Sequence, residues 1–311
     1  MAAVSYSGPS NSRLRSSYYN REVLRLVRCK IPIVPTNTPP VSQGKRFPFQ
    51  VSIVAWGDLL GYGRKIAEAA FNPMDERAKS SISRMREFHR IVAEHSSRNF
   101  PSLVINDGVA AFRDLSLRSR SNSHDFLEQS WKLFNAINAL EAKRGDPGIR
   151  MVVACGFRMR GRRATTESDH SKVNSILHRF REGQMTAEQA IREASTARPS
   201  FDVVPQLQAN FAFTKAYVAE SSGSGGGLPG SNFYLDTALL LDPTCAWPSG
   251  ENGIMWRHNT LGLDTEFRRV TNLQKVKHPE GGASELRTGL EVAQFLAGDI
   301  DVLQGLRSSS K

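Results

Sequence analysis

A single acid near the end of a long apolar run constrains this chain most. Residues 47–58 read FPFQVSIVAWGD, a pattern that predicts a buried strand, and Asp58 follows its last apolar positions. Gly61, Tyr62 and Gly63 come shortly afterwards, so the chain is expected to turn sharply there. An acid in this place can cap a helix, hold a metal ion or be an ordinary turn residue.

A second acid lies in a predicted hairpin. The segment 100–115, FPSLVINDGVAAFRDL, has two apolar runs on either side of Asn-Asp-Gly, which is typical of a tight β-hairpin with Asp107 in its turn. If this hairpin neighbours the first strand, Asp58 and Asp107 emerge at one edge of a sheet, where each raises the pKa of the other. Mg²⁺ or Mn²⁺, which prefer oxygen ligands, would remove that repulsion. Backbone N–H groups at Gly61 and Gly63, ahead of a helix, would attract phosphate.

The rest of the chain alternates between helical and extended patterns. Helices are predicted over 73–98, 123–145 (beginning at Ser123 or Asp125 and ending at Gly145), two stretches within 171–198, 205–222 and 283–306. Strands are predicted within 147–163, 232–241 and 254–263, and 223–230 reads as a flexible loop. This order predicts an α/β or α+β sheet with helices on one face.

The composition bounds the organisation of the chain. Residues 1–45 are predicted to form a flexible basic segment with a short helix near 20–28, residues 46–306 one domain, and residues 307–311 a polar tail. The formal charge of +11 favours polyanions, either a nucleoside triphosphate or nucleic acid. The chain has neither a membrane-length apolar run nor a signal-peptide core, and its three cysteines lie far apart. We therefore expect a cytoplasmic protein that does not enter a membrane.

The order of these motifs resembles the catalytic domain of class III nucleotidyl cyclases. WGDLLGYG, which contains Asp58, is similar to the family pattern F-x-D-[IV]-x-G-[FY]-[ST], and INDGVAAF, which contains Asp107, is similar to I-G-D-x-x-x-A-x-F. IRMVVACG resembles R-x-G-I-x-x-G, and Asn210 opens a segment that resembles N-x-x-x-R. The resemblance covers roughly residues 47–222.

This resemblance implies a ferredoxin-like, palm-type cyclase domain with a mixed, mainly antiparallel sheet and helices packed on it. Asp58, Asp107 and the carbonyl of Leu59 would hold two Mn²⁺ or Mg²⁺ ions per active site, and the ribose 3′ oxygen would attack the α-phosphorus.

The resemblance also implies roles around the ions. The turn of Gly61, Tyr62 and Gly63 would bind the β and γ phosphates of a nucleoside triphosphate. In this family the sites lie between two chains, which implies a homodimer in which Asn210 acts at the site of the other subunit.

Several positions depart from the family pattern. Thr214 stands where the family has arginine, so Lys215, the next residue, is a candidate catalytic cation. The other candidates for this role are Arg113, Lys275 and Lys277. The positions that select the base are occupied by Leu103 and Val203, which cannot hydrogen-bond a purine edge, unless the alignment slips by one residue to Asp202.

In these departures the chain looks like the pyrimidine cyclases of bacterial Pycsar anti-phage defence, which make cyclic UMP or cyclic CMP. The expected substrate is therefore UTP, with CTP as the second choice, and a separate effector protein would sense the product. Nucleic acid is not the expected partner. A catalytically inactive nucleotide- or RNA-binding module and a polymerase-like palm domain stay open as alternatives.

Overall fold

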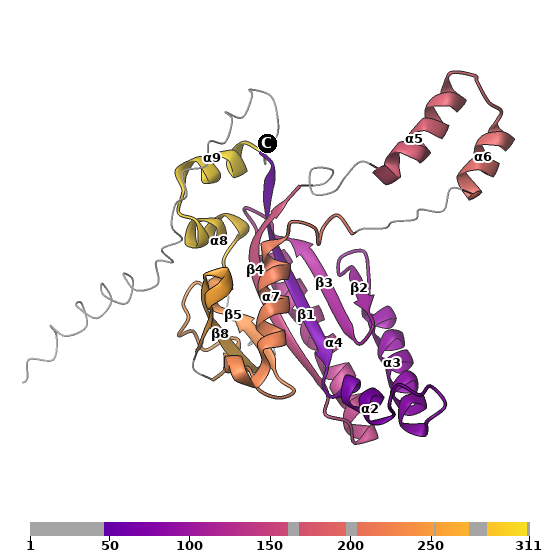
Figure 1. Ribbon diagram of the computed structural model, residues 1–311. Coiled ribbons are helices and arrows are strands. Elements are labelled where there is room, and N and C mark those ends of the chain that lie inside the picture. Colours follow the sequence, from indigo (N-terminus) through magenta and orange to yellow (C-terminus); the bar gives the residue numbers. More distant parts are fainter. Residues whose placement is uncertain (1–46, 161–167, 197–203, 252, 274–284, 310–311) are drawn as a thin grey trace, which may run out of the picture.

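The computed structural model describes residues 47–160, 168–196, 204–251, 253–273 and 285–309 (Figure 1). The predicted N-terminal segment 1–45, with its helix near 20–28, lies outside the described residues. None of the helices in the described part is both long and apolar enough to span a bilayer.

One sheet organises these residues. Its strands run in the order β2-β3-β1-β4-β5-β8-β6, and β7 also pairs with β8. Neighbouring strands are antiparallel except β4 and β5, which are parallel. The strands are β1 (Phe49–Leu59), β2 (Ser102–Ile105), β3 (Gly108–Asp114), β4 (Ile149–Met159), β5 (Phe233–Asp236), β6 (Ser249–Gly250), β7 (Ile254–His258) and β8 (Leu263–Asn272).

The first four strands form a ferredoxin-like unit. Helices α2 (Tyr62–Glu68) and α3 (Glu76–His95) follow β1, and α4 (Ser121–Arg144) connects β3 to β4. This β-α-β-β-α-β order, with the strands arranged β2-β3-β1-β4, is the ferredoxin-like arrangement. The predicted α+β class with a mainly antiparallel sheet is therefore confirmed.

Helices cover both faces of the sheet, so the prediction of helices on one face is wrong. The face of β1 that carries Ile53 and Leu59 packs against α3, α4 and α8 (Gly289–Leu296). The face that carries Val54 and Trp56 packs against α7 (Phe211–Ser222), which lies in front of β1 and β4 in Figure 1. The continuous apolar run of β1 is the sign of this arrangement, because a strand buried on both sides has no polar alternation.

Several helix boundaries differ from the prediction. Helix α4 begins at Ser121 and not at Ser123 or Asp125. Gly145, whose φ of 72° is left-handed, terminates it after Arg144, as predicted. Helix α7 begins only after Asn210, whose side chain accepts a hydrogen bond from the backbone of Phe213. The residues before Asn210 form turns, so the predicted start at 205 is too early.

The chain after β8 and the segment between β4 and α7 also hold helices. The predicted closing helix is two helices, α8 and α9 (Ile300–Ser308), because Asp299 caps a new helix directly after Gly298. The predicted tail therefore begins two residues too early. The two stretches predicted within 171–198 are α5 (Ser168–Arg181) and α6 (Ala187–Thr196).

Candidate functional site

The structure brings Asp58 and Asp107 together at one edge of the sheet. Asp58 pairs with Gly108 in the β1–β3 ladder, and the backbone N–H of Leu59 donates to the carbonyl of Asp107 at 3.1 Å. Asn106, with a left-handed φ of 55°, and Asp107 form the two-residue turn of the hairpin. The predicted convergence of the two acids is therefore confirmed by the register of the strands.

The surroundings of the two carboxyl groups disfavour their ionisation. Burial raises the pKa of Asp58 to about 7, and the negative charge of Asp107 adds to this effect. Burial also raises the pKa of Asp107 above its usual range. The guanidinium groups of Arg150 and Arg84 lower the pKa of Asp58 but do not cancel the increase. A cation bound between the carboxylates would relieve the cost of ionising both.

The glycine turn lies directly behind Asp58. Gly61, with a φ of 74°, is the residue before α2, and its left-handed conformation lets the chain turn from strand into helix. The side chain of Tyr62 is buried, and its hydroxyl lies 3.5 Å from the sulfur of Met85. Gly63 is exposed. The turn therefore offers backbone groups to a ligand, while its tyrosine ring belongs to the core.

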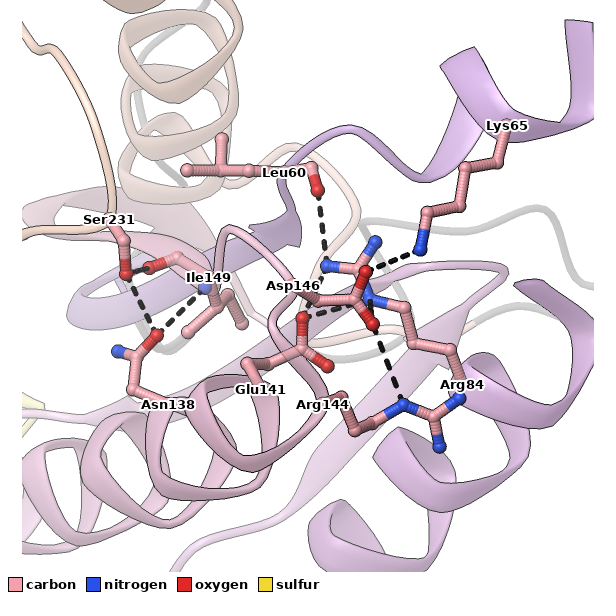
Figure 2. Close-up of polar contacts among 9 residues, drawn as sticks. All are labelled: Leu60, Lys65, Arg84, Asn138, Glu141, Arg144, Asp146, Ile149 and Ser231. Atoms are coloured by element: carbon pink, nitrogen blue, oxygen red, sulfur yellow. Dashed lines mark hydrogen bonds and ion pairs between the residues drawn. The ribbon is translucent and has the colours of Figure 1, made fainter. Parts of the chain in front are cut away.

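A network of ion pairs anchors this turn to the helices behind it (Figure 2). The Arg84 guanidinium, which is 1% exposed, donates to the carbonyl of Leu60 at 3.1 Å and forms an ion pair with Glu141 of α4. Lys65 of α2 bonds to Asp146 at 2.5 Å. Because these contacts join the turn to both α3 and α4, the residues after Asp58 are held in one position.

The start of β4 is fixed beside the same turn. The side-chain oxygen of Asn138 accepts hydrogen bonds from the backbone of Ile149 at 3.0 Å and from the hydroxyl of Ser231 at 2.8 Å (Figure 2). This contact sets the position of the residue that follows Ile149, which is Arg150.

Arg150 and Glu220 are site residues that the sequence reasoning missed. Arg150 pairs with Asp58 across β1 and β4, and its Nη2 lies 2.8 Å from Oε1 of Glu220 near the end of α7. Its Nη1 donates to the carbonyl of Leu228 at 3.3 Å. Glu220 is the only acid in the predicted helix 205–222, and this could have marked it as a candidate site residue. Arg150 has no such mark in the sequence, because only the register of β1 and β4 places it beside Asp58.

Asn210 does not lie beside the carboxylate pair of its own chain. Its side-chain nitrogen donates to the carbonyl of Gln206 at 2.8 Å and to the hydroxyl of Ser52 at 3.3 Å. Ser52 lies near the start of β1 and Asp58 near its end, which separates them by about 20 Å along the strand. Asn210 would therefore have to act at the site of another subunit, as the resemblance implies.

Lys215 lies farther along α7 in a buried ion pair. Its Nζ is 2.7 Å from the carboxylate of Asp236 on β5, and the lysine is 8% exposed. Its catalytic role stays a prediction, and it requires this ion pair to open.

The two predicted base-selecting positions have different outcomes. Leu103, on β2, is partly buried and packs against the cluster that contains Trp56 and Phe112, on the sheet face that carries Asp58. Val203 lies outside the described residues.

The donor set fits a particular kind of metal site. Within the described parts of the chain, no group of three or more His, Cys, Asp or Glu side chains is placed to hold a metal ion. The pair of Asp58 and Asp107 instead offers two hard oxygen ligands. Mg²⁺ and Mn²⁺ commonly use one or two carboxylates together with substrate phosphates and water, so the pair fits such ions.

Comparisons with known proteins give distant structural similarities. No protein-family model and no curated protein sequence matches the chain. It is similar to the crystal structure of the guanylyl cyclase Cya2, at 10% identity over 78% of this chain and 100% of that chain, with a TM-score of 0.44. It is also similar to the adenylyl cyclase CyaB from P. aeruginosa, at 10% identity over 73% and 96%, with a TM-score of 0.37. A bacterial light-regulated adenylyl cyclase is similar at 11% identity over 84% and 98%, with a TM-score of 0.41.

Proposed function

We propose that this chain is a nucleotidyl cyclase, which converts a nucleoside triphosphate into the 3′,5′-cyclic nucleotide and pyrophosphate. One observation carries the proposal: Asp58 and Asp107 meet at the end of β1, directly before the glycine turn at Gly61. The resemblance of the surrounding motifs to class III cyclases supports it. So does the formal charge of +11, which suits an anionic substrate.

Asp58, Asp107 and the carbonyl of Leu59 would hold two Mg²⁺ or Mn²⁺ ions. When bound, these ions neutralise charge on the triphosphate and make the ribose 3′-hydroxyl more acidic. The raised pKa of Asp58, caused first by burial and then by the charge of Asp107, means that the site favours a cation once both acids are ionised.

The other residues around the two carboxylates would position the triphosphate. The backbone N–H groups of the turn at Gly61–Gly63 would contact the β and γ phosphates, and Arg150, which forms an ion pair with Glu220, lies beside Asp58. In the reaction a bond forms between the 3′ oxygen and the α-phosphorus, and the bond from that phosphorus to the pyrophosphate oxygen breaks. The hydroxyl proton leaves to solvent. The chain contributes by positioning and by stabilising charge.

The substrate and assembly follow from the same resemblance. Leu103 presents an apolar side chain where purine cyclases place a polar one, which favours UTP or CTP. The product would serve as a second messenger for a separate effector in anti-phage defence. A homodimer is part of the proposal because Asn210 and Asp58 lie at opposite ends of β1 within one chain.

The test is a product assay with each of the four labelled nucleoside triphosphates and Mn²⁺. We expect the wild type to form a cyclic product from UTP or CTP, and Asp58→Ala to form none. The matched control is Asp264→Ala, which removes an acid on β8 that is 45% exposed, and it should keep the activity.

Folded wild-type protein that makes no cyclic product from any of the four substrates would contradict the proposal. If both the wild type and Asp58→Ala bound RNA without forming product, the chain would instead be a binding module. Linear oligonucleotide products would indicate a polymerase-like palm domain.

A further inference from the structure

Three aromatic rings meet on the sheet face that carries Asp58. Phe213 and Tyr217 lie one turn apart on α7, with ring centroids 6.1 Å from each other. Both rings contact Trp56 of β1, at 5.7 Å from Phe213 and 5.4 Å from Tyr217. We call these three residues the aromatic surface.

The aromatic surface continues into the carboxylate pair. Trp56 precedes Asp58 by two residues, so both side chains point to the same face of β1. Gly108 lies against both side chains: the position that a Cβ would take there is 2.6 Å from Cη2 of Trp56 and 3.4 Å from Oδ1 of Asp58. The absence of a side chain at Gly108 therefore lets the indole reach the edge of the proposed metal site.

The outer part of the surface is open in the single chain. Trp56 is 5% exposed and forms the floor, whereas Tyr217 is 48% exposed, and Phe213 lies between these extremes. Leu103, the predicted base-selecting residue, packs partly buried against the cluster that contains Trp56. The structure thus has an apolar, ring-bearing face directly beside the place where the α-phosphate would be bound.

We infer that the aromatic surface stacks the base of the nucleoside triphosphate, with Tyr217 as its principal contact. This inference rests on the proposed function. Only a ribose separates the base of a nucleotide from its α-phosphate. If the carboxylate pair holds the ions that bind the α-phosphate, the base therefore lies within reach of these rings. Stacking on an aromatic ring tolerates any base, because every base has a π-face. It explains how a site with an apolar Leu103 can hold a base without a polar contact at that position.

The experiment compares two probes in the presence of Mn²⁺, each by isothermal titration calorimetry. One is 3′-deoxy-UTP, which lacks the attacking hydroxyl, and the other is inorganic triphosphate, which lacks the base and the ribose. We expect Tyr217→Ala to weaken 3′-deoxy-UTP binding about tenfold or more, the range of one lost stacking contact. Triphosphate binding should change less than twofold, and Tyr217→Phe should bind both probes as the wild type does.

The matched control is Phe211→Ala. Phe211 lies on the same helix and is 57% exposed, but it makes no ring contact with the aromatic surface. This variant should bind both probes normally. Light scattering of each variant at the concentrations of the titration measures its oligomeric state.

The outcomes separate the inference from the function on which it rests. Unchanged 3′-deoxy-UTP binding by Tyr217→Ala would overturn the inference alone. Equal weakening of both probes together with dissociation of the protein would also overturn it, because the surface would then be a contact between subunits. Failure of the wild type to bind either probe would overturn the proposed function and the inference with it.

Discussion

Replacing Asp58 with asparagine is expected to stabilise the metal-free protein at neutral pH. Burial, with the charge of Asp107 as the second cause, raises the pKa of Asp58 from 3.8 to about 7. Between these two values the folded chain holds a proton that the unfolded chain has released. The contribution of Asp58 to stability therefore falls as the pH rises from about 4 to about 7.

The size of the effect follows from the same pKa. At 1.36 kcal/mol per pKa unit, the cost of ionising Asp58 in the folded state is at most ~4 kcal/mol. Because the side chain is only partly buried, solvent screens its charge, and we expect about 1–2 kcal/mol. Asparagine has the same shape as aspartate, so Asp58→Asn removes this cost without leaving a cavity.

Urea denaturation in EDTA measures this effect at pH 5 and pH 8, followed by circular dichroism. We expect Asp58→Asn to exceed the wild type in free energy of unfolding by more at pH 8 than at pH 5. Asp264→Asn, at an acid on the distant strand β8, is the control and should show no such gap. If Asp58→Asn were no more stable than the wild type at pH 8, the claim that ionising Asp58 destabilises the metal-free protein would be refuted.

Two further substitutions test the packing around the site. Gly108→Ala would place a Cβ 2.6 Å from the Trp56 ring and should cost about 1–3 kcal/mol of stability, measured by urea denaturation; an unchanged midpoint would show that the ring can move aside freely. Lys215→Met leaves the fully buried Asp236 without its cation and should cost about 3–5 kcal/mol, part of which Asp236→Asn in the same chain should restore, because asparagine carries no charge and keeps an oxygen that can accept from the backbone N–H of Ala238. An unchanged free energy of unfolding of Lys215→Met, measured by urea denaturation, would contradict a structural role for this ion pair.

The sequence predicts the strand, the hairpin and the turn around the two acids because each is a local pattern. The apolar run that ends near Asp58 and the Asn-Asp-Gly turn at Asp107 both depend on neighbouring residues alone. Their meeting requires only that the hairpin pair with the first strand, which the β1–β3 register bears out.

The remaining features of the site depend on contacts that no local pattern contains. Arg150 lies beside Asp58 because β4 pairs with β1 in one particular register. From the sequence Lys215 could be a solvated lysine on a helix, and only the fold places Asp236 of β5 against it. Helix α7 packs closely on the sheet face that carries Trp56 because its inner positions are alanines. The alanine pattern alone does not indicate which face of the sheet the helix covers.

The most direct test of the central claim is equilibrium Mn²⁺ binding, measured by electron paramagnetic resonance in the presence of 3′-deoxy-UTP. We predict that the wild type binds Mn²⁺ and that Asp58→Asn and Asp107→Asn each lose most of that binding, because both carboxylates are ligands of the same ions. Wild-type Mn²⁺ affinity in both variants would contradict the account.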